Sequence, residues 1–163
     1  MFRQARQNEF QILTKISFTS KGYWEYPTEY FNIWNDELTI TPKYIEENTV
    51  YVYEVENKIL GYYSIVELKE NLEVSKIVLQ KGFWLEHMFL LPKYIGQRIG
   101  TKMFTHIRKI CLSKGIHKLG ILADPNAIGF YEKMGCQYQD EFPSTIPDRT
   151  TPWLVLKISN FEK

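Results

Sequence analysis

Residues 86–104 read EHMFLLPKYIGQRIGTKMF and combine a strand pattern, a stop and a helix start. The apolar run is typical of a buried strand, and Pro92 ends it because proline has no N–H to give to a sheet. Gly96 and Gly100 permit close approach of another group to the backbone. The first N–H groups of the following helix have no partner inside it, and the helix dipole adds partial positive charge. We therefore expect a pocket for a phosphorylated ligand, with a plain strand-to-helix turn as the alternative.

The distribution of charge supports an anionic ligand for this segment. The whole chain has a net charge of +1, yet no Asp or Glu occurs from His87 to Ala123. The same window holds seven Lys and Arg residues, which leaves 13 basic against 19 acidic residues elsewhere. A local excess of positive charge attracts anions to one place.

The rest of the chain alternates helix and strand patterns. Ile99, Met103, Ile107 and Ile110 recur at helical spacing and predict a helix over 96–114, with Gly115 as its C-terminal cap. The stretch 49–68 predicts a hairpin that turns at Glu56-Asn57. The remaining expected elements are a strand at 2–6, helical segments up to 17, at 27–34 and at 42–47 (with Thr41 as N-cap), a strand at 117–123, a helix at 125–135, and closing strands at 136–142 and 152–159.

Composition excludes several classes of protein. The chain has 163 residues, of which 44% are hydrophobic and 15% aromatic, as expected of one soluble domain and not of a disordered chain. No apolar stretch is long enough to span a membrane, and the first residues lack the apolar core of a signal peptide. Cys111 and Cys136 form no CxxC pair and are expected to be reduced thiols in a cytoplasmic protein.

Several common functional motifs are absent from the sequence. It contains no GxGxxG, no GxxxxGK[ST], no GxSxG and no HExxH. The three histidines do not have the spacing of metal ligands, so no metal site is expected.

Two stretches of the sequence together resemble the motifs of a known family. EHMFLLPKYIGQRIGTKMF (86–104) and ADPNAIGFYEKMGC (123–136) resemble, in order and separation, the two core motifs of the GNAT superfamily, the N-acetyltransferases that use acetyl-coenzyme A. The resemblance implies a mixed α/β (α+β) fold in a single domain, with a central, twisted, mostly antiparallel sheet that splays between its middle strands and is flanked by helices. It also divides the domain into 1–48 (acceptor-side strand and helices), 49–92 (central strands), 93–136 (acetyl-CoA-binding core) and 137–163 (closing strands).

The resemblance also implies cofactor-binding residues. Met88, Phe89 and Leu90 match the strand whose backbone binds the pantetheine arm, and the loop that holds the pyrophosphate corresponds to Gly96, Gln97, Arg98, Ile99, Gly100 and Thr101. The chain departs from the family pattern at two positions: Ile95 replaces a polar residue, and Arg98 replaces the first glycine of a Gly-x-Gly pair. The family often has Asn seven residues before its tyrosine, where this chain has Asp124, so Asn126 is the expected cofactor contact.

The chemistry of acyl transfer requires a base and an acid. Tyr131 matches the tyrosine that protonates the departing thiolate in the family, with an amphipathic core tyrosine as the alternative. The acceptor amine must be neutral to attack, so a base accepts its proton directly or through water. Glu86 shares a strand face with Met88 and ranks first, although a salt-bridge role is also open. His87 points to the other face unless a bulge turns it, and it ranks second.

The acceptor site is expected in the N-terminal helices and the late strands. A small-molecule amine is preferred over a protein N-terminus, and neither nucleic acid nor a membrane is expected as a partner. Arg149 would suit a carboxylate on the acceptor, and the aromatic residues an apolar or cationic body, although most of those aromatics would equally suit a core. The candidate acceptor-binding residues are Trp24, Tyr26, Tyr30, Ser144 and Arg149.

Two other classes of function remain open at this stage. A basic helix with Tyr94 and Phe104 nearby also suits a nucleic-acid or phospho-ligand binding module without catalysis. Arg98 in place of glycine suits a degenerate fold that binds acetyl-CoA as a sensor. The presence of both Glu86 and Tyr131 favours an enzyme. Homodimers are frequent in the family, so a homodimer is one expected state.

Overall fold

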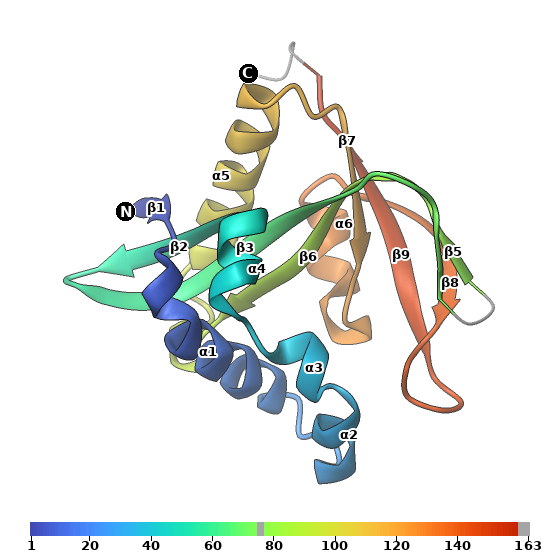
Figure 1. Ribbon diagram of the computed structural model, residues 1–163, viewed down its shortest axis with the longest axis horizontal. Coiled ribbons are helices and arrows are strands. Elements are labelled where there is room, and N and C mark those ends of the chain that lie inside the picture. The colour runs from blue at the N-terminus through green and yellow to red at the C-terminus, as the bar shows by residue number, and fades with distance from the viewer. Residues whose placement is uncertain (75–76, 160–163) are drawn as a thin grey trace. The chain divides into compact units, whose positions relative to one another are not determined.

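The computed structural model describes residues 1–74 and 77–159, which form a mixed α/β fold (Figure 1). Seven strands form one sheet in the order β1-β2-β3-β6-β7-β9-β8, and a two-stranded sheet pairs β4 with β5. Among the described ladders only β6–β7 is parallel. The expected fold class, a mostly antiparallel sheet flanked by helices, is confirmed. The strands are β1 (Phe2–Gln4), β2 (Thr49–Val55), β3 (Lys58–Leu68), β4 (Leu72–Val74), β5 (Ile77–Leu79), β6 (Gly82–Leu90), β7 (Lys118–Leu122), β8 (Gln137–Pro143) and β9 (Thr150–Lys157).

Each of the five helices expected from the sequence has a counterpart among the described residues, with different ends. Gly115 has φ +69 and lies two residues after Ser113, the last residue of the longest helix, as expected of a C-terminal cap. Thr41 caps the helix that starts at Pro42, because its Oγ1 accepts from the N–H of Tyr44 at 3.1 Å. The helices are α1 (Phe10–Gly22), α2 (Thr28–Ile33), α3 (Asn35–Leu38), α4 (Pro42–Glu47), α5 (Ile99–Ser113) and α6 (Ile128–Lys133), with 3-10 turns at Gln7–Glu9, Pro92–Tyr94 and Pro125–Ala127.

The chain divides into two compact units. The first unit comprises Met1–Ile65 and His87–Met103, and the second comprises Val66–Glu86 and Phe104–Lys163, so β3, β6 and α5 contribute to both. The expected splay between the middle strands concerns the placement of one unit against the other and stays a prediction. The assignment of roles to 1–48, 49–92, 93–136 and 137–163 also stays a prediction, and 160–163 lie outside the described residues.

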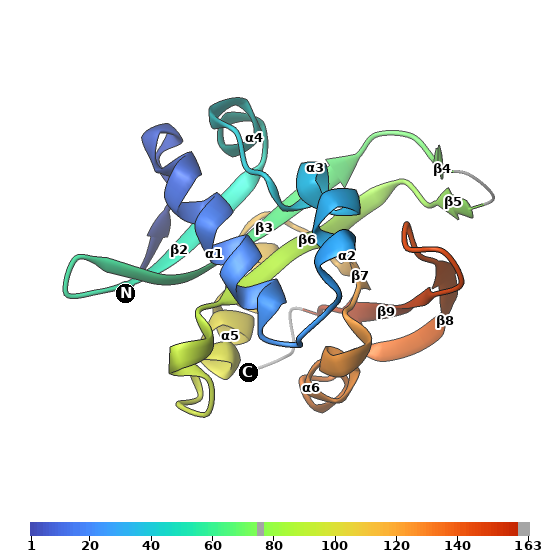
Figure 2. The same ribbon diagram turned by 90° about the horizontal axis from the view of Figure 1, so that it is seen from below.

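The first unit packs helices against the antiparallel strands β1, β2 and β3. In Figure 2, α1, α3 and α4 lie on one side of β2 and β3. Leu13 and Ile16 of α1 form a buried cluster there with Val52 and Tyr62. Leu60, which is 5% exposed, instead packs with Ile99 and Met103 at the start of α5. The strands of this unit therefore contribute to two buried clusters, one with α1 and α4 and the other with the start of α5.

The second unit is built on the ladders β7–β9 and β8–β9. Leu119 pairs with Leu156 and Ile121 with Leu154, and all four side chains are almost fully buried. On β6, Phe83–Leu85 pairs in parallel with Leu119–Ile121. The paired strands β4 and β5 and the short helix α3 were not expected from the sequence, because none of them is long enough to show a clear period.

Candidate functional site

In the part of β6 that belongs to the first unit, successive side chains pack into two different clusters. His87 and Phe89 face Tyr62, with ring centroids 6.1 and 6.0 Å from it. Met88 and Leu90 pack instead with Ile99 and Met103 of α5. The side chains of this segment are thus occupied by packing, so a ligand along it would contact the backbone, as the resemblance implies for Met88, Phe89 and Leu90.

The loop between β6 and α5 turns through two left-handed residues. Gly96 has φ +88 and Arg98 has φ +61. The carbonyl of Arg98 accepts from the N–H of Lys102 at 3.2 Å, so Arg98 is the N-cap of α5 and the N–H groups of Ile99 and Gly100 precede the first bond of the helix. Helix N-termini and nests of N–H groups made with left-handed residues bind anions. The helix therefore begins at Ile99 and not at Gly96, because the residues before it must form this turn.

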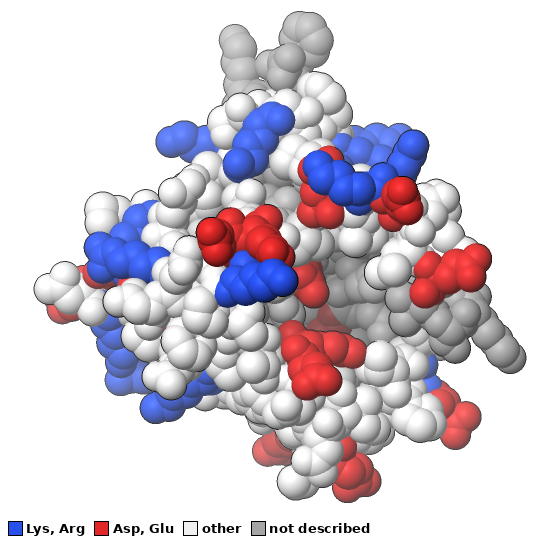
Figure 3. Space-filling model, in the orientation of Figure 1, with Lys and Arg blue, Asp and Glu red and all other residues white. Residues whose placement is uncertain are grey.

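The loop is exposed and carries polar groups. Gln97, Arg98 and Thr101 are exposed, and Ile95 is 48% exposed. On the face in Figure 3, Lys and Arg side chains gather over the turn end of β2 and β3, and acidic side chains lie over α2 and α3. On α4 of the same unit, by contrast, Lys43 and Glu47 form an ion pair at 3.8 Å.

Glu86 and His87, the two candidate bases, have contrasting environments. Glu86 is exposed, at the end of the part of β6 that belongs to the second unit. His87 is 7% exposed and stacks with Phe89 at 5.6 Å. Burial, with a smaller contribution from the charge of Lys21, lowers the pKa of His87 to about 4. His87 is therefore neutral at pH 7 and shielded from solvent, whereas Glu86 is open to it.

Tyr131 lies on α6 in the second unit and is 8% exposed. Its ring meets Phe130 and Phe104 at 5.3 and 6.1 Å in edge-to-face geometry. Burial, with smaller contributions from Cys136 and Asp124, raises the pKa of its hydroxyl. The phenol is thus protonated at neutral pH, and burial makes it a weaker acid than an exposed tyrosine.

Asn126 lies in the turn before α6 and is exposed. Its backbone N–H and its Nδ2 both donate to Oδ1 of Asp124, at 2.9 and 3.1 Å. Asp124 therefore caps the turn and orients the Asn126 amide.

The aromatic residues expected at the acceptor site divide into packed and exposed members. Tyr26 and Tyr30 contact Trp34 edge to face at 5.1 and 5.5 Å, and Trp34 is 5% exposed. Trp24 is 41% exposed and meets Tyr23. Nζ of Lys21 lies 4.5 Å from the centroid of the Trp34 ring, so this cluster already holds one cation.

Ser144 and Arg149 close the loop between β8 and β9. The N–H of Ser144 donates to the carbonyl of Arg149 at 2.8 Å, and Oγ of Ser144 accepts from the N–H of Ile146 at 3.1 Å. Ile146 is 2% exposed and anchors the loop. The structure thus brings Ser144 and Arg149 together, while Trp24, Tyr26 and Tyr30 lie in the other unit.

Sequence patterns missed two aromatic residues of the second unit, Trp84 and Phe142, whose rings lie near that of Trp153. Trp84 on β6 lies 6.5 Å from Trp153 on β9, and Phe142 on β8 stacks on Trp153 at 5.3 Å. Trp84 and Phe142 belong to strands far apart in sequence, so no local spacing connects them.

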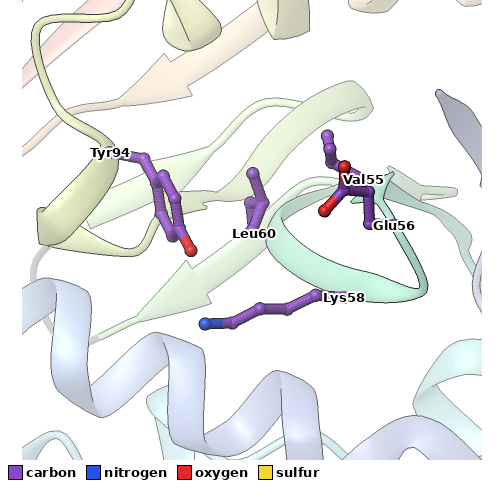
Figure 4. A pocket seen from close by; sticks show the side chains of 5 residues that line it. All are labelled: Val55, Glu56, Lys58, Leu60 and Tyr94. Carbon is purple, nitrogen blue, oxygen red and sulfur yellow. The ribbon is translucent and has the colours of Figure 1, made fainter.

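A hollow of about 250 Å³ lies elsewhere, beside the turn of the β2–β3 hairpin. Val55, Glu56, Lys58, Leu60 and Tyr94 line it (Figure 4). Nζ of Lys58 lies 5.6 Å from the centroid of the Tyr94 ring. None of the residues expected to bind the cofactor or the acceptor lines this hollow.

In residues 1–74 and 77–159, no three His, Cys, Asp or Glu side chains form a group that could hold a metal ion. Over the same residues, no helix is both long and apolar enough to cross a membrane.

Cys111 is fully buried, and burial raises the pKa of its thiol to about 12, so it is no nucleophile at neutral pH.

The chain thus leads from a strand through a turn with two left-handed residues into a helix, within a mostly antiparallel sheet, in the order that the resemblance to acetyltransferases implies. The sequence profile described as the acetyltransferase (GNAT) family matches residues 19–136. The chain belongs to this family and is an acetyltransferase, with acetyl-coenzyme A as its co-substrate. A comparison with curated proteins gives no match.

Solved structures agree on the fold. The PaiA N-acetyltransferase of Thermoplasma acidophilum, in complex with coenzyme A, superposes with a TM-score of 0.74 at 16% identity, over 96% of this chain and 98% of that one. A GCN5-related N-acetyltransferase from Rhodopseudomonas palustris gives 0.71 at 15% identity, over 97% and 95%. An aminoglycoside 6'-N-acetyltransferase complexed with coenzyme A gives 0.66 at 13% identity, over 100% and 99%.

Proposed function

We propose that this chain is an N-acetyltransferase that moves the acetyl group of acetyl-CoA to a primary amine of a small molecule, by direct attack in a ternary complex. The observation that carries the proposal is the loop with Gly96 and Arg98 in left-handed conformations directly before α5. Its backbone N–H groups suit the pyrophosphate of coenzyme A. Two structural neighbours, PaiA and the aminoglycoside acetyltransferase, were solved with coenzyme A.

Each cofactor-binding residue has a proposed role. The backbone of Met88, Phe89 and Leu90 binds the pantetheine arm, and the turn from Gly96 to Thr101 holds the pyrophosphate. Arg98 adds positive charge to that turn. Asn126 contributes a further contact through the amide that Asp124 orients.

Proton transfer is assigned to Glu86 and Tyr131. Glu86 accepts the proton of the amine through water, because it is exposed, whereas His87 is buried among aromatic rings. The neutral amine nitrogen forms the bond to the acetyl carbon as the carbon–sulfur bond breaks, and the nitrogen then releases its extra proton to solvent to give the amide. Tyr131 donates its proton to the leaving sulfur and recovers one from solvent. Amides along β6 polarise the thioester carbonyl.

A small amine suits the charge of the first unit. Acidic side chains lie over α2 and α3 in Figure 3, and such a field attracts a protonated amine. Nζ of Lys21 lies 5.5 Å from the ring centroid of Tyr26 and 4.5 Å from that of Trp34, which supports a cation-binding role for this cluster. Trp24 adds an exposed ring beside them.

Tyr131→Phe tests the assignment, with thiol release from acetyl-CoA as the readout and a panel of amines as acceptors. Loss of a positioned general acid is expected to lower kcat about 100-fold or more, while coenzyme A binding and Tm change little. Tyr138→Phe is the matched control, since Tyr138 is an exposed tyrosine on β8 whose hydroxyl donates to Glu141. Equal kcat for Tyr131→Phe and the unmodified protein at every pH would refute the acid role.

Glu86→Gln is expected to change the pH–rate profile, and an unchanged profile would place the base elsewhere.

A further inference from the structure

The helix that carries Tyr131 is short and weakly capped at its start. α6 has six residues, and Ala127, which precedes it, has no polar side chain that could cap the first turn. Isolated helices of this length are marginal in water, so packing against other elements has to hold α6 in place. The position of the Tyr131 hydroxyl therefore depends on the contacts that α6 makes within the second unit.

The C-terminal end of α6 forms a closed turn on the backbone of Tyr131. The N–H of Cys136 donates to the carbonyl of Tyr131 at 3.0 Å, and the N–H of Gly135 donates to that of Glu132 at 3.0 Å. Gly135 has φ +97, so this is the left-handed glycine turn that commonly ends a helix. These bonds satisfy the carbonyls of Tyr131 and Glu132 and leave that of Met134 for a partner outside the helix.

Arg108 on α5 supplies that partner. Its Nη2 donates to the carbonyl of Met134, and its guanidinium lies against Gly135, because a Cβ built there would be 2.8 Å from Nη2. A cation at the C-terminal end of a helix also opposes the negative end of the helix dipole. The central carbon of the same guanidinium lies 5.6 Å from the ring centroid of Phe104, one turn earlier on α5.

Phe104 makes a second contact between α5 and α6. Its ring meets those of Tyr131 and Phe130 edge to face, with centroids 6.1 and 6.2 Å away. Phe104 is almost fully buried, as is Tyr131. Phe104 thus fixes the side of α6 that carries Tyr131, and Arg108 fixes its C-terminal end. Two points one turn apart on α5 therefore set both the position and the rotation of α6.

We propose that Arg108 is a positioning residue for acetyl transfer: by holding the carbonyl of Met134 it fixes the end of α6, and so keeps the Tyr131 hydroxyl where it protonates the departing thiolate. This inference rests on the proposed function, because it explains how the acid assigned there is held in place. Arg108 acts through the backbone and takes no part in the proton transfer. Misplacing a reacting group by about 1 Å can lower a rate about 100-fold, so loosening of α6 is expected to change kcat more than binding.

Substitutions of Arg108 test the proposal, with thiol release from acetyl-CoA as the readout. Arg108→Met removes the donor and is expected to lower kcat about 10-fold or more, while the KM for acetyl-CoA and the Kd of coenzyme A stay within about twofold. Arg108→Lys retains a charged donor and is expected to keep most of the activity. Lys109→Met is the matched control, because Lys109 is an exposed cation on the same helix. Arg108→Gln, which is shorter and neutral, replaces Arg108→Met if the latter does not fold. An unchanged kcat in the variant without the long donor would overturn the proposal.

A double-mutant cycle shows whether Arg108 acts through Tyr131. In the Tyr131→Phe protein the hydroxyl to be positioned is absent, so adding Arg108→Met is expected to change kcat by no more than about twofold. General destabilisation would lower the rate in both backgrounds, so the cycle separates positioning from folding. Full additivity of the two losses would show that Arg108 affects the rate by another route, and would overturn the proposal.

Hydrogen exchange tests the positioning without turnover. The backbone amides of Met134, Gly135 and Cys136 are expected to exchange about 10-fold or more faster in Arg108→Met, while those of the β7–β9 ladder keep their rates. That result supports the hold on α6 even if no amine is acetylated, an outcome that would contradict only the proposed function. Unchanged exchange at these three amides would overturn the inference. Acetylation that Tyr131→Phe abolishes and Arg108→Met leaves intact would contradict only this inference.

Discussion

Arg98 occupies a backbone conformation that normally favours glycine. Its φ of +61 places a Cβ in the left-handed region, which costs a non-glycine residue about 1–2 kcal/mol. The position matches the first glycine of the family's Gly-x-Gly pair, so the sequence departure coincides with strain in the loop. A strained residue in a binding loop is expected to be retained for what its side chain does.

Arg98→Gly and Arg98→Ala separate conformation from charge. Both substitutions remove the guanidinium, but only glycine removes the left-handed strain. Arg98→Gly is therefore expected to have a free energy of unfolding about 1 kcal/mol above that of Arg98→Ala. Both are expected to weaken coenzyme A binding, measured by calorimetry, if Arg98 contacts phosphate. Equal affinities in all three proteins would remove Arg98 from the phosphate site.

His87 couples stability to pH. Burial lowers its pKa to about 4, whereas an unfolded histidine titrates near 6.5. The unfolded state thus binds more protons between these values, so stability is full above about pH 6.5 and is lost as pH falls towards 4. Lys21, whose charge contributes to the shift, and the rings of Tyr44, Tyr62 and Phe89 surround the imidazole.

Denaturant unfolding at pH 7 and pH 4.5 measures this coupling. The unmodified protein is expected to lose about 2 kcal/mol more between these pH values than His87→Gln, in which the titrating group is absent. His117→Gln is the control, because His117 is exposed and its removal leaves His87 in place. The same pH dependence in His87→Gln and the unmodified protein would show that His87 is not the coupled group.

At the scale of elements, β3 and β6 approach each other closely at Gly61. A Cβ at this position would lie 2.6 Å from the carbonyl oxygen of Phe89, a backbone atom that cannot rotate away. The adjacent bond from the N–H of Leu91 to the carbonyl of Leu60, at 2.8 Å, holds the segments together. The strand that is proposed to bind the pantetheine arm thus depends on glycine in its neighbour.

Gly61→Ala is expected to destabilise the protein by about 2 kcal/mol or more, because overpacking forces the strands apart. Gly129→Ala in α6 is the matched control, since a Cβ there meets nothing within 4 Å and alanine favours a helix by up to about 1 kcal/mol. The two substitutions should therefore shift Tm in opposite directions. A neutral Gly61→Ala would show that β3 and β6 tolerate separation at this point.

Elements with strong local signals were predictable from the sequence. The turn at Glu56 and Asn57 has φ of +50 and +63, as a two-residue hairpin requires, and Thr41 caps α4 as expected. The start of α5 was wrong by three residues, since spacing alone does not show that Gly96 and Arg98 leave the helical region. The contacts of Trp84 and Phe142 with Trp153 could not be predicted, because these residues meet only through strand pairing.

The turn from Gly96 to Thr101 was predictable because one segment forms it, and its role in binding the cofactor stays a prediction. The loop from Gly96 to Thr101 follows from local order of strand, glycine and helix. The roles of Glu86, Tyr131 and Arg149 stay predictions, because they depend on chain segments that no local pattern connects. Burial of His87 became visible only in the structure, through its contacts with Tyr44 and Tyr62.

At the scale of the whole molecule, ligand-linked stability distinguishes an acetyltransferase from a binding module for nucleic acid. The chain has a net charge of only +1, and its basic residues are concentrated in one window. Binding of a ligand to the folded state raises Tm by mass action, whereas a ligand without a site leaves Tm unchanged. Contacts of basic residues with DNA would weaken steeply as salt concentration rises.

Thermal unfolding is measured with acetyl-CoA, coenzyme A, ATP and a short DNA duplex at two salt concentrations. At about 100 times its Kd, acetyl-CoA is expected to stabilise the protein by about 2.7 kcal/mol, or roughly 5–10 °C in Tm. ATP and DNA are expected to have little effect, because neither carries a pantetheine arm for the backbone of Met88, Phe89 and Leu90. A salt-sensitive rise with DNA alone would identify the basic window as a nucleic-acid surface and refute the cofactor site. A rise with acetyl-CoA without turnover of any amine would instead indicate a sensor that binds the cofactor without transfer.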